Sequence, residues 1–467
     1  MRRTRRPFLL VVTLAALVSF VAASPVAAKP QAAPRSGPGT LDPSFGDQGW
    51  AVASFGARTL GSAMAVQRNG DVVVVGTVTN RGTPSFALAR FRLDGALDTT
   101  FGGDGRVTTA FTPNGGQAYA VAIDGHGRIV VAGRKHEQKA QLYDFVLARY
   151  RPDGSLDHSF GSGGKVTTGF GKDDGTATAV AIQHDGRIVV GGLLDTTGDV
   201  SERWELARYL PNGSLDPSFG DHGKVQTIFP VHTAEGYEFL SAIVVQPNGR
   251  ILAGGDFFDG QACEGRAALA RYLPDGTLDP SFGTKGTILT AFGGRNDSIV
   301  IALARAGKGD LVAAGRTASL GCGGEPPPEH PQFVVARYKP DGTLAPHFGA
   351  KGVVITGFHK PLKDVFNATF TGVAVQKDGK VVAAGWESDS SQPATVGSAM
   401  VLARLLPSGQ LDPAFGQDGK VVAEYPAGQE AMAEGVGLEP SGRIVAGGTV
   451  RPDKPDEYSV VVARFLG

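Results

Sequence analysis

The chain has little cysteine, no surplus of either charge and no long apolar run after its first 28 residues. Its 45 Lys and Arg residues balance 45 Asp and Glu residues, whereas nucleic-acid-binding proteins usually carry a basic surplus or stripe. Beyond residue 28, no stretch is long and apolar enough to span a bilayer. Its 2 cysteines, without positioned histidines, fall short of a zinc site. The composition therefore argues against a nucleic-acid partner, a membrane span in the mature chain and a bound metal.

Signatures of well-known catalytic sites are missing as well. The chain has no G-x-S-x-G elbow, no H-E-x-x-H, no phosphate loop and no G-x-G-x-x-G between a strand and a helix. Its 9 histidines are scattered, and the Asp-rich loops do not match the spacing of a calcium loop. We therefore expect no cofactor and assign no catalytic residue.

Glycine, by contrast, is abundant, with 67 residues, and it recurs within a repeated phrase, L-D-x-x-F-G-x-x-G, which we call the anchor. The phrase occurs seven times, with Ala345 in place of its Asp in the sixth copy. The copies start at Leu41, Leu97, Leu156, Leu215, Leu278, Leu344 and Leu411, between 56 and 67 residues apart. A period of this length indicates that each repeat is one supersecondary unit stacked on its neighbours.

Each repeat contains four short runs that read as strands. Between the anchors at Leu156 and Leu215, the runs are 165–170, 177–182, 187–192 and 204–209. They alternate or are rich in β-branched residues, and Gly, Asp and Pro bound them. The second and third runs are joined by pairs such as Asp-Gly and Asn-Gly, which tolerate the positive φ of a two-residue hairpin. Seven such four-stranded antiparallel sheets, arranged radially, make an all-β, seven-bladed β-propeller.

The two ends of the chain predict how the ring closes. Residues 50–55, after the first anchor, correspond to the outer strand of a blade. The chain ends at residues 460–465, a third strand with no fourth strand after it. We expect the N-terminal run to supply that strand and close the ring, since an open stack would leave sheet faces unpaired.

The N-terminal segment predicts export. Basic residues precede an apolar run at 8–23 that is too short for a membrane span, and small residues at 26–28 offer a cleavage site before Lys29. The string 4–10 also resembles a twin-arginine signal, so the general secretory and twin-arginine routes both stay open. We expect a signal peptide at 1–28, a disordered linker at 29–40 and the propeller at 41–467 of a secreted or extracytoplasmic protein.

The 2 cysteines fall in equivalent variable loops of consecutive blades. Cys263 follows the second strand of the fourth blade, and Cys322 follows that of the fifth. In an exported protein this placement favours a disulfide, whereas two free thiols on separate loops are the alternative.

A recurring Arg–Asp pattern has a structural interpretation. One arginine of each third strand is followed eight residues later by the anchor Asp. The expected pairs are Arg90–Asp98, Arg149–Asp157, Arg208–Asp216, Arg271–Asp279, Arg404–Asp412 and, across the closure, Arg464–Asp42. Arg337 faces Ala345 and lacks this partner. Because an active site occurs once per chain rather than once per blade, we expect the pairs to hold the anchor loops by charge-assisted hydrogen bonds.

Binding residues are expected on the loops that vary between repeats. These loops connect second to third strands and one blade to the next, and they lie on one face of a propeller, which we call the variable-loop face. The aromatic candidates for ligand contact are Trp386, Phe257, Phe258, Tyr237 and Phe366. Trp204 holds the third-strand position of Phe86 and Phe145, so we expect it in the core.

The repeat resembles a known family, the delta-60 repeat proteins of bacteria. The resemblance is carried by units such as 145–161 (FVLARYRPDGSLDHSFG) together with 180–192 (VAIQHDGRIVVGG), and it covers residues 41–467. Ala345, Leu405 and the longer later loops depart from the pattern. The resemblance implies a propeller-like fold and export, and it brings no enzymatic activity.

Two functions compete at this stage. A secreted, non-enzymatic propeller would bind an extracellular protein or glycan, as a monomer, through its variable-loop face. An extracellular hydrolase or lyase would instead place its site at the mouth of the central channel. The inner strands, such as residues 118–123, are rich in Ala and Val rather than in acidic residues or histidine, which favours binding. A purely structural surface component is a third alternative.

Overall fold

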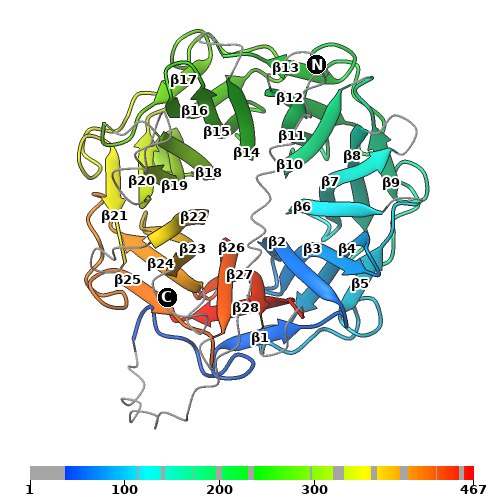
Figure 1. Ribbon diagram of the computed structural model, residues 1–467, viewed down its shortest axis with the longest axis horizontal. Helices are drawn as coiled ribbons and strands as arrows, with labels where there is room; N and C mark the ends of the chain where they lie inside the picture. Colours follow the sequence, from blue (N-terminus) through cyan, green and yellow to red (C-terminus); the bar gives the residue numbers. More distant parts are fainter. Residues whose placement is uncertain are drawn as a thin grey trace, which may run out of the picture. The chain divides into compact units, whose positions relative to one another are not determined.

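The computed structural model shows a β-propeller built from seven four-stranded antiparallel sheets (Figure 1). It describes residues 37–112, 115–137, 142–171, 173–195, 202–229, 236–294, 297–318, 331–358, 365–389, 398–426, 429–451 and 457–467. Within these ranges η1 (Gly307–Gly309) is a 3-10 turn, and no helix is long and apolar enough to cross a membrane. The predicted fold class is therefore confirmed.

The strands take equivalent places in each blade, and blade one begins at β2. The strands nearest the centre are β2 (Arg58–Val66), β6 (Gly116–Ile123), β10 (Asp174–Ile182), β14 (Tyr237–Val245), β18 (Asp297–Arg305), β22 (Val365–Val375) and β26 (Glu430–Leu438). The second strands are β3 (Val72–Asn80), β7 (Ile129–Glu137), β11 (Ile188–Asp195), β15 (Ile251–Asp259), β19 (Leu311–Ala318), β23 (Val381–Asp389) and β27 (Ile444–Arg451). The third strands are β4 (Thr83–Phe91), β8 (Leu142–Tyr150), β12 (Glu202–Tyr209), β16 (Glu264–Tyr272), β20 (Gln332–Tyr338), β24 (Ala399–Leu405) and β28 (Ser459–Phe465). The outer strands are β5 (Arg106–Thr109), β9 (Lys165–Thr168), β13 (Lys224–Thr227), β17 (Thr287–Thr290), β21 (Val353–Thr356), β25 (Lys420–Ala423) and β1 (Trp50–Ala53).

The hairpin between the two inner strands differs in detail from the prediction. In blade three, the Gly186 N–H donates to Gln183 O at 3.0 Å, and the Gln183 N–H donates to Arg187 O at 2.8 Å. Three residues therefore form the loop rather than two. Gly186 has a φ of 83°, whereas Asp185 is not among the residues with positive φ. This is the three-residue hairpin, in which Asp185 belongs to an ordinary turn and glycine alone takes the left-handed conformation.

The inner strands share one irregularity. Each inner strand carries a bulge at the same position, where its pairing with the second strand skips one residue. The skipped residues are Ser62, Tyr119, Thr178, Ser241, Ile301, Thr371 and Glu434. A bulge leaves one residue unpaired and re-aims its side chain, so the inner edge of the ring presents one such residue per blade.

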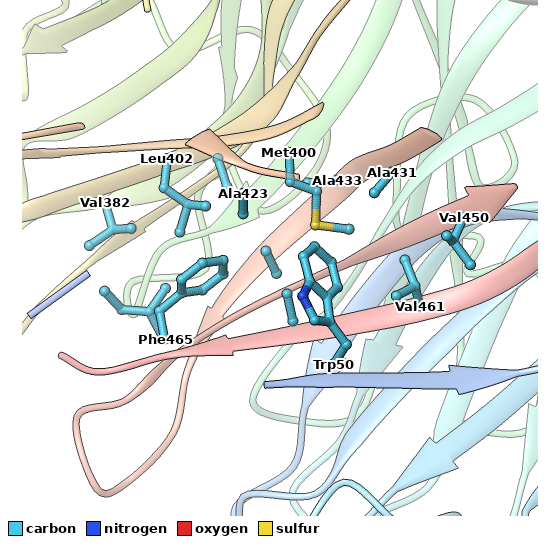
Figure 2. Close-up of a cluster of buried hydrophobic side chains, with 14 of the residues drawn as sticks. Trp50, Val382, Met400, Leu402, Ala423, Ala431, Ala433, Val450, Val461 and Phe465 are labelled. Carbon is cyan, nitrogen blue, oxygen red and sulfur yellow. The ribbon is translucent and has the colours of Figure 1, made fainter. Parts of the chain in front are cut away.

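The hydrophobic core lies between neighbouring blades. Figure 2 shows one of its clusters, in which the Trp50 side chain from β1 points toward Met400 of blade six. Trp50 is 4% exposed, and Phe465 and Leu402 in the same cluster are fully buried. The strand added from the N-terminus thus contributes to the core as well as to the sheet.

The ring closes through the N-terminal strand, as predicted. β1 pairs antiparallel with β28, with Trp50 opposite Ala463. The preceding residues are also bonded to the last blade, because the Leu466 N–H donates to Thr40 O at 2.9 Å and the Gly39 N–H donates to Leu466 O at 2.8 Å. Residues 37–40, which the sequence assigned to a disordered linker, therefore belong to the loop of blade seven. The earlier part of the predicted linker and the predicted signal peptide lie outside the described residues.

Candidate functional site

The recurring arginines hold the anchor loops and join neighbouring blades. In blade two, Arg149 Nε donates to Asp157 Oδ2 at 2.8 Å, and its Nη1 donates to the carbonyl of Pro211 in blade three. The guanidinium also lies over the Phe160 ring, 4.5 Å from its centroid. One side chain thus fixes its own anchor and the next blade, which is a structural task.

All six expected Arg–Asp pairs are present. Their shortest N–O distances are 2.7 Å for Arg90–Asp98, 2.8 Å for Arg149–Asp157, Arg208–Asp216 and Arg271–Asp279, 2.9 Å for Arg404–Asp412 and 3.1 Å for Arg464–Asp42. Burial alone would raise the pKa of Asp279, but hydrogen bonds from Ser281 and the guanidiniums of Arg271 and Arg250 outweigh it and lower the pKa to about 2. The pairs are therefore ionised over the physiological range.

In blade five, where Ala345 replaces the anchor Asp, a different carboxylate pairs with the repeated arginine. Arg337 Nε donates to Asp310 Oδ2 at 2.8 Å. Asp310 immediately precedes the second strand β19, a position that holds Arg187 in blade three. The carboxylate has moved from the anchor to the inner hairpin, and Arg337 keeps an acidic partner.

Two of the five predicted contact residues are core residues. Trp386 is 6% exposed and Phe257 is 2% exposed. They lie within β23 and β15, which extend further than the sequence suggested, so their rings pack in the blades and not on the loops. The prediction of ligand contact is wrong for both. The side chain of Phe366 lies outside the described part of the chain, while Trp204 is fully buried as expected.

The other two predicted residues form an exposed aromatic pair. Tyr237 is 41% exposed and stacks on half-buried Phe258, with ring centroids 4.9 Å apart and planes 22° apart. Ile228, which the sequence analysis missed, is 47% exposed beside the same blades. The Phe229 N–H donates to Glu238 Oε1 at 3.1 Å, which ties the segments of Ile228 and Tyr237 together. We call Tyr237 and Phe258 the aromatic patch.

An arginine with aromatic neighbours lies in blade two. Arg134 is 9% exposed, its Nε donates to Gln117 Oε1 at 2.8 Å, and its guanidinium lies over the Tyr143 ring, 4.2 Å from the centroid. Tyr119, the bulge residue of this blade, also donates to Gln117 Oε1 at 3.0 Å. Among the described residues no carboxylate forms an ion pair with Arg134. The sequence signal was an arginine directly after Gly133, where other repeats mostly have an uncharged residue.

Glu434 is the one carboxyl among the seven bulge residues. Neighbouring bulges lie side by side round the ring, because Thr371 Oγ1 donates to Ala433 O at 2.7 Å and Thr178 Oγ1 donates to Leu240 O. Burial raises the pKa of Glu434 to about 8, and within the described chain it has no hydrogen bond or ion pair. The inner edge of the ring therefore holds a carboxyl that is protonated at neutral pH.

The predicted disulfide is only half within the described residues. Cys263 is disulfide-bonded, whereas Cys322 lies outside the described ranges, so the Cys263–Cys322 bridge stays a prediction. Mass spectrometry of the protein without reductant should find no alkylatable thiol. In the described part of the chain, no three His, Cys, Asp or Glu residues are grouped so that they could hold a metal ion.

A match to a protein family agrees with the fold. Five segments, residues 67–101, 127–160, 183–219, 246–282 and 376–415, match the family described as a domain of unknown function (DUF5122) β-propeller. No curated protein matches the sequence.

Among solved structures, a protein of unknown function from Dyadobacter fermentans is 14% identical, with a TM-score of 0.40, and the match covers 90% of this chain and 98% of that one. The polysaccharide lyase Uly1 is 10% identical, with a TM-score of 0.46 and coverage of 87% and 90%. The narrower resemblance to delta-60 repeat proteins stays a prediction. The five matched segments support a propeller-repeat family for this chain.

Proposed function

We propose that this protein is a secreted, non-enzymatic propeller that binds an extracellular protein or glycan on its variable-loop face. The observation that carries the proposal is the aromatic patch. Tyr237 exposes 41% of its surface at the start of β14, and half-buried Phe258 stacks beneath its ring. Apolar side chains gathered on a surface commonly mark an interaction site, and Tyr is among the residues that contribute most to binding energy.

The packing beneath Tyr237 supports this role. Phe258 stacks under the Tyr237 ring, so the ring is held in place before a ligand arrives. A preordered aromatic ring loses little side-chain entropy on binding. The patch also flanks the connection between β13 and β14, a loop that is long in this repeat, and variable loops on a repeated frame are the usual place for recognition.

The test compares binding by the exported protein and by single variants. A glycan array and a pull-down from the extracellular fraction identify the ligand, and Tyr237→Ala should then weaken its binding about tenfold or more. Tyr237→Phe keeps the ring and should bind nearly as the parent does. Leu93→Ala is the matched control, because Leu93 is 48% exposed but follows β4, at the opposite end of the blades. Equal losses for Leu93→Ala and Tyr237→Ala would remove the patch from the binding site.

A second candidate function is an extracellular hydrolase or lyase acting at the central channel. Glu434 favours it, because a carboxyl with a pKa of about 8 can donate a proton at neutral pH. Release of reducing or unsaturated ends from a panel of polysaccharides would reveal such an activity. Glu434→Gln should abolish it, whereas Glu430→Gln, on the same strand, should not.

A further inference from the structure

In four blades a second basic side chain reaches the anchor carboxylate. In each of these blades it comes from the residue directly before the second strand. The pairs are Arg187–Asp216 at 2.9 Å, Arg250–Asp279 at 2.8 Å, Lys380–Asp412 at 3.5 Å and Arg443–Asp42 at 2.6 Å. In blade three, Arg187 also donates to the carboxylate of Asp185 in the hairpin loop. The repeat therefore contains a place for a cation between the inner hairpin and the anchor.

In blade one, an acidic residue replaces the basic residue at this position. Asp71 occupies the position of Arg187, directly before β3, and the anchor carboxylate of Asp98 is retained. Asp71 Oδ2 accepts a hydrogen bond from Asn69 Nδ2 at 2.6 Å, and no basic side chain of the described residues forms an ion pair with it. Blade five differs, because its acidic residue at this position is matched by the loss of the anchor carboxylate.

The missing side chain leaves a groove between blades one and two. The groove has a volume of about 700 Å³, and four carboxylates but only two guanidiniums line it. They are Asp71, Asp98, Asp124 and Asp153, with Arg68 and Arg90. The corresponding groove between blades seven and one, where Arg443 is present, is smaller, at about 440 Å³. The groove between blades one and two is thus both larger and more acidic.

The two guanidiniums that line the groove are already engaged. Arg90 donates to Asp98 Oδ2 at 2.7 Å and to the Pro152 carbonyl, and Arg68 Nη1 donates to Gly125 O at 3.3 Å. Asp124 accepts from Arg128 Nε at 2.6 Å, and Asp153 accepts from the N–H and hydroxyl of Ser155, so Asp71 and Asp153 are the two lining carboxylates for which the described residues supply no ion-pair partner. An additional cation in the groove would contact the carboxylates of Asp71 and Asp98.

We propose that this groove binds the guanidinium of an arginine side chain from a partner polypeptide. The chain's own Arg187 and Arg250 show the geometry, since each places a planar guanidinium against the anchor carboxylate. Guanidinium donors form a fork that matches a carboxylate better than an ammonium does. The site lies at the hairpin and anchor ends of the blades, opposite to the aromatic patch, so it goes beyond the function proposed above.

The test titrates the full exported protein with a short peptide containing one arginine, and with the same peptide containing citrulline. Citrulline keeps the shape of arginine but has no charge. The arginine peptide should bind saturably, and the citrulline and lysine peptides should each bind about tenfold more weakly or less. Absence of saturable binding at millimolar concentration, or equal binding of the three peptides, would overturn the proposal. So would tighter binding of glucosamine than of the arginine peptide.

One variant distinguishes a loss of peptide binding in the groove from a loss of folding. Asp71→Arg installs the cation that the sister repeats already carry, so it should fill the groove and reduce peptide binding about tenfold or more while the melting temperature is kept or raised. Asp221→Arg makes the same charge change on a side chain that is 94% exposed in another blade, and it should bind as the parent does. Tyr237→Ala should also leave this binding unchanged. Undiminished binding by Asp71→Arg would contradict the assignment.

Discussion

At the scale of single residues, repetition distinguishes structural charges from functional ones. Five of the repeated arginines pair with an anchor Asp, donate to a carbonyl of a neighbouring blade and cover an anchor Phe: Arg90, Arg149, Arg208, Arg271 and Arg464. A buried charge of this kind is tolerated because it is paired and hydrogen-bonded. Residues that depart from the repeat, such as Asp71 and Glu434, are therefore better candidates for function than the repeated arginines.

Substitution of one of the repeated arginines should lower the free energy of unfolding more when its Arg–Asp pair is more deeply buried. Arg149→Ala leaves Asp157 buried without its cation, and we expect a loss of about 3–5 kcal/mol in the free energy of unfolding. Arg337→Ala should cost clearly less, because Arg337 and Asp310 side chains are each 17% exposed and water can solvate the carboxylate that remains. Denaturant unfolding measures both. Equal losses would show that burial does not determine the loss of stability. They would argue against the proposed role of the arginines in holding the anchor loops.

Buried carboxyls should make stability depend on pH. Glu205 is 4% exposed at a third-strand position that other repeats fill with Ala or Val. Burial raises its pKa to about 8, although Lys224 opposes the shift. The folded state therefore holds this proton more tightly than the unfolded chain, whose ordinary value is 4.5. Its contribution is fully favourable below pH 4.5 and is lost as the pH rises toward 8.

Glu205→Gln tests this titration. The variant should be more stable than the parent at pH 8, by about 1.4 kcal/mol for each unit of pKa shift, and the difference should vanish near pH 4. Glu264→Gln, at a side chain that is 45% exposed, should change the pH profile little. A constant difference between Glu205→Gln and the parent across this range would show that Glu205 does not titrate with folding.

At the scale of the elements, the inner-strand bulge depends on a glycine in the strand beside it. Every second strand has a glycine at one position, where an added Cβ would lie between 1.8 and 2.2 Å from a carbonyl oxygen of the inner strand. These glycines are Gly76, Gly133, Gly192, Gly255, Gly315, Gly385 and Gly448. The bulge brings the two backbones too close for any side chain, so the glycine is required by a close approach and not by its φ.

Adjacent glycines in β11 allow a matched experiment. In Gly192→Ala the new Cβ would lie 1.9 Å from Thr176 O, where only backbone movement can relieve the clash. We expect a loss of about 3 kcal/mol or more, seen as a lower midpoint in denaturant. Gly191→Ala would meet the ends of the Ile243 and Leu240 side chains, and Ala132 holds this position in blade two. It should cost about 1 kcal/mol or less. The reverse order would refute the bulge argument.

The sequence predicted the elements better than the site. Period and turn residues located the strands, because glycine, proline and the anchor recur in every repeat. Trp386 and Phe257 were misplaced because a strand that continues past its expected end carries aromatic residues into the core. Arg134 and Ile228 were missed because their environments arise from residues of other strands. A single departure from the repeat, such as Asp71, is visible in the sequence, but its groove is visible only once the blades are placed together.

At the scale of the whole molecule, the ring depends on contacts between segments that are far apart in the sequence. The last blade takes β26, β27 and β28 from the C-terminus and β1 from the N-terminus (Figure 1). Its anchor loop is likewise assembled from both ends, since the Asp42 N–H donates to Arg464 O at 2.8 Å and Arg464 pairs with Asp42. Blade seven therefore has the same bonds as the continuous blades, although its chain is interrupted.

A chain that begins at Ala57 should lose this closure. It would lack β1, the Trp50 side chain in the core shown in Figure 2 and the partner of Arg464, and it would leave β28 as an unpaired edge. Exposed strand edges pair with other chains, so we expect aggregation, or a monomer with a melting temperature lowered by several degrees. A chain that begins at Ser36 keeps all these contacts and is the control. If the chain beginning at Ala57 were a monomer with an unchanged melting temperature, six complete blades and a three-stranded seventh would be sufficient for the fold, and the N-terminal strand would have no part in holding the ring closed.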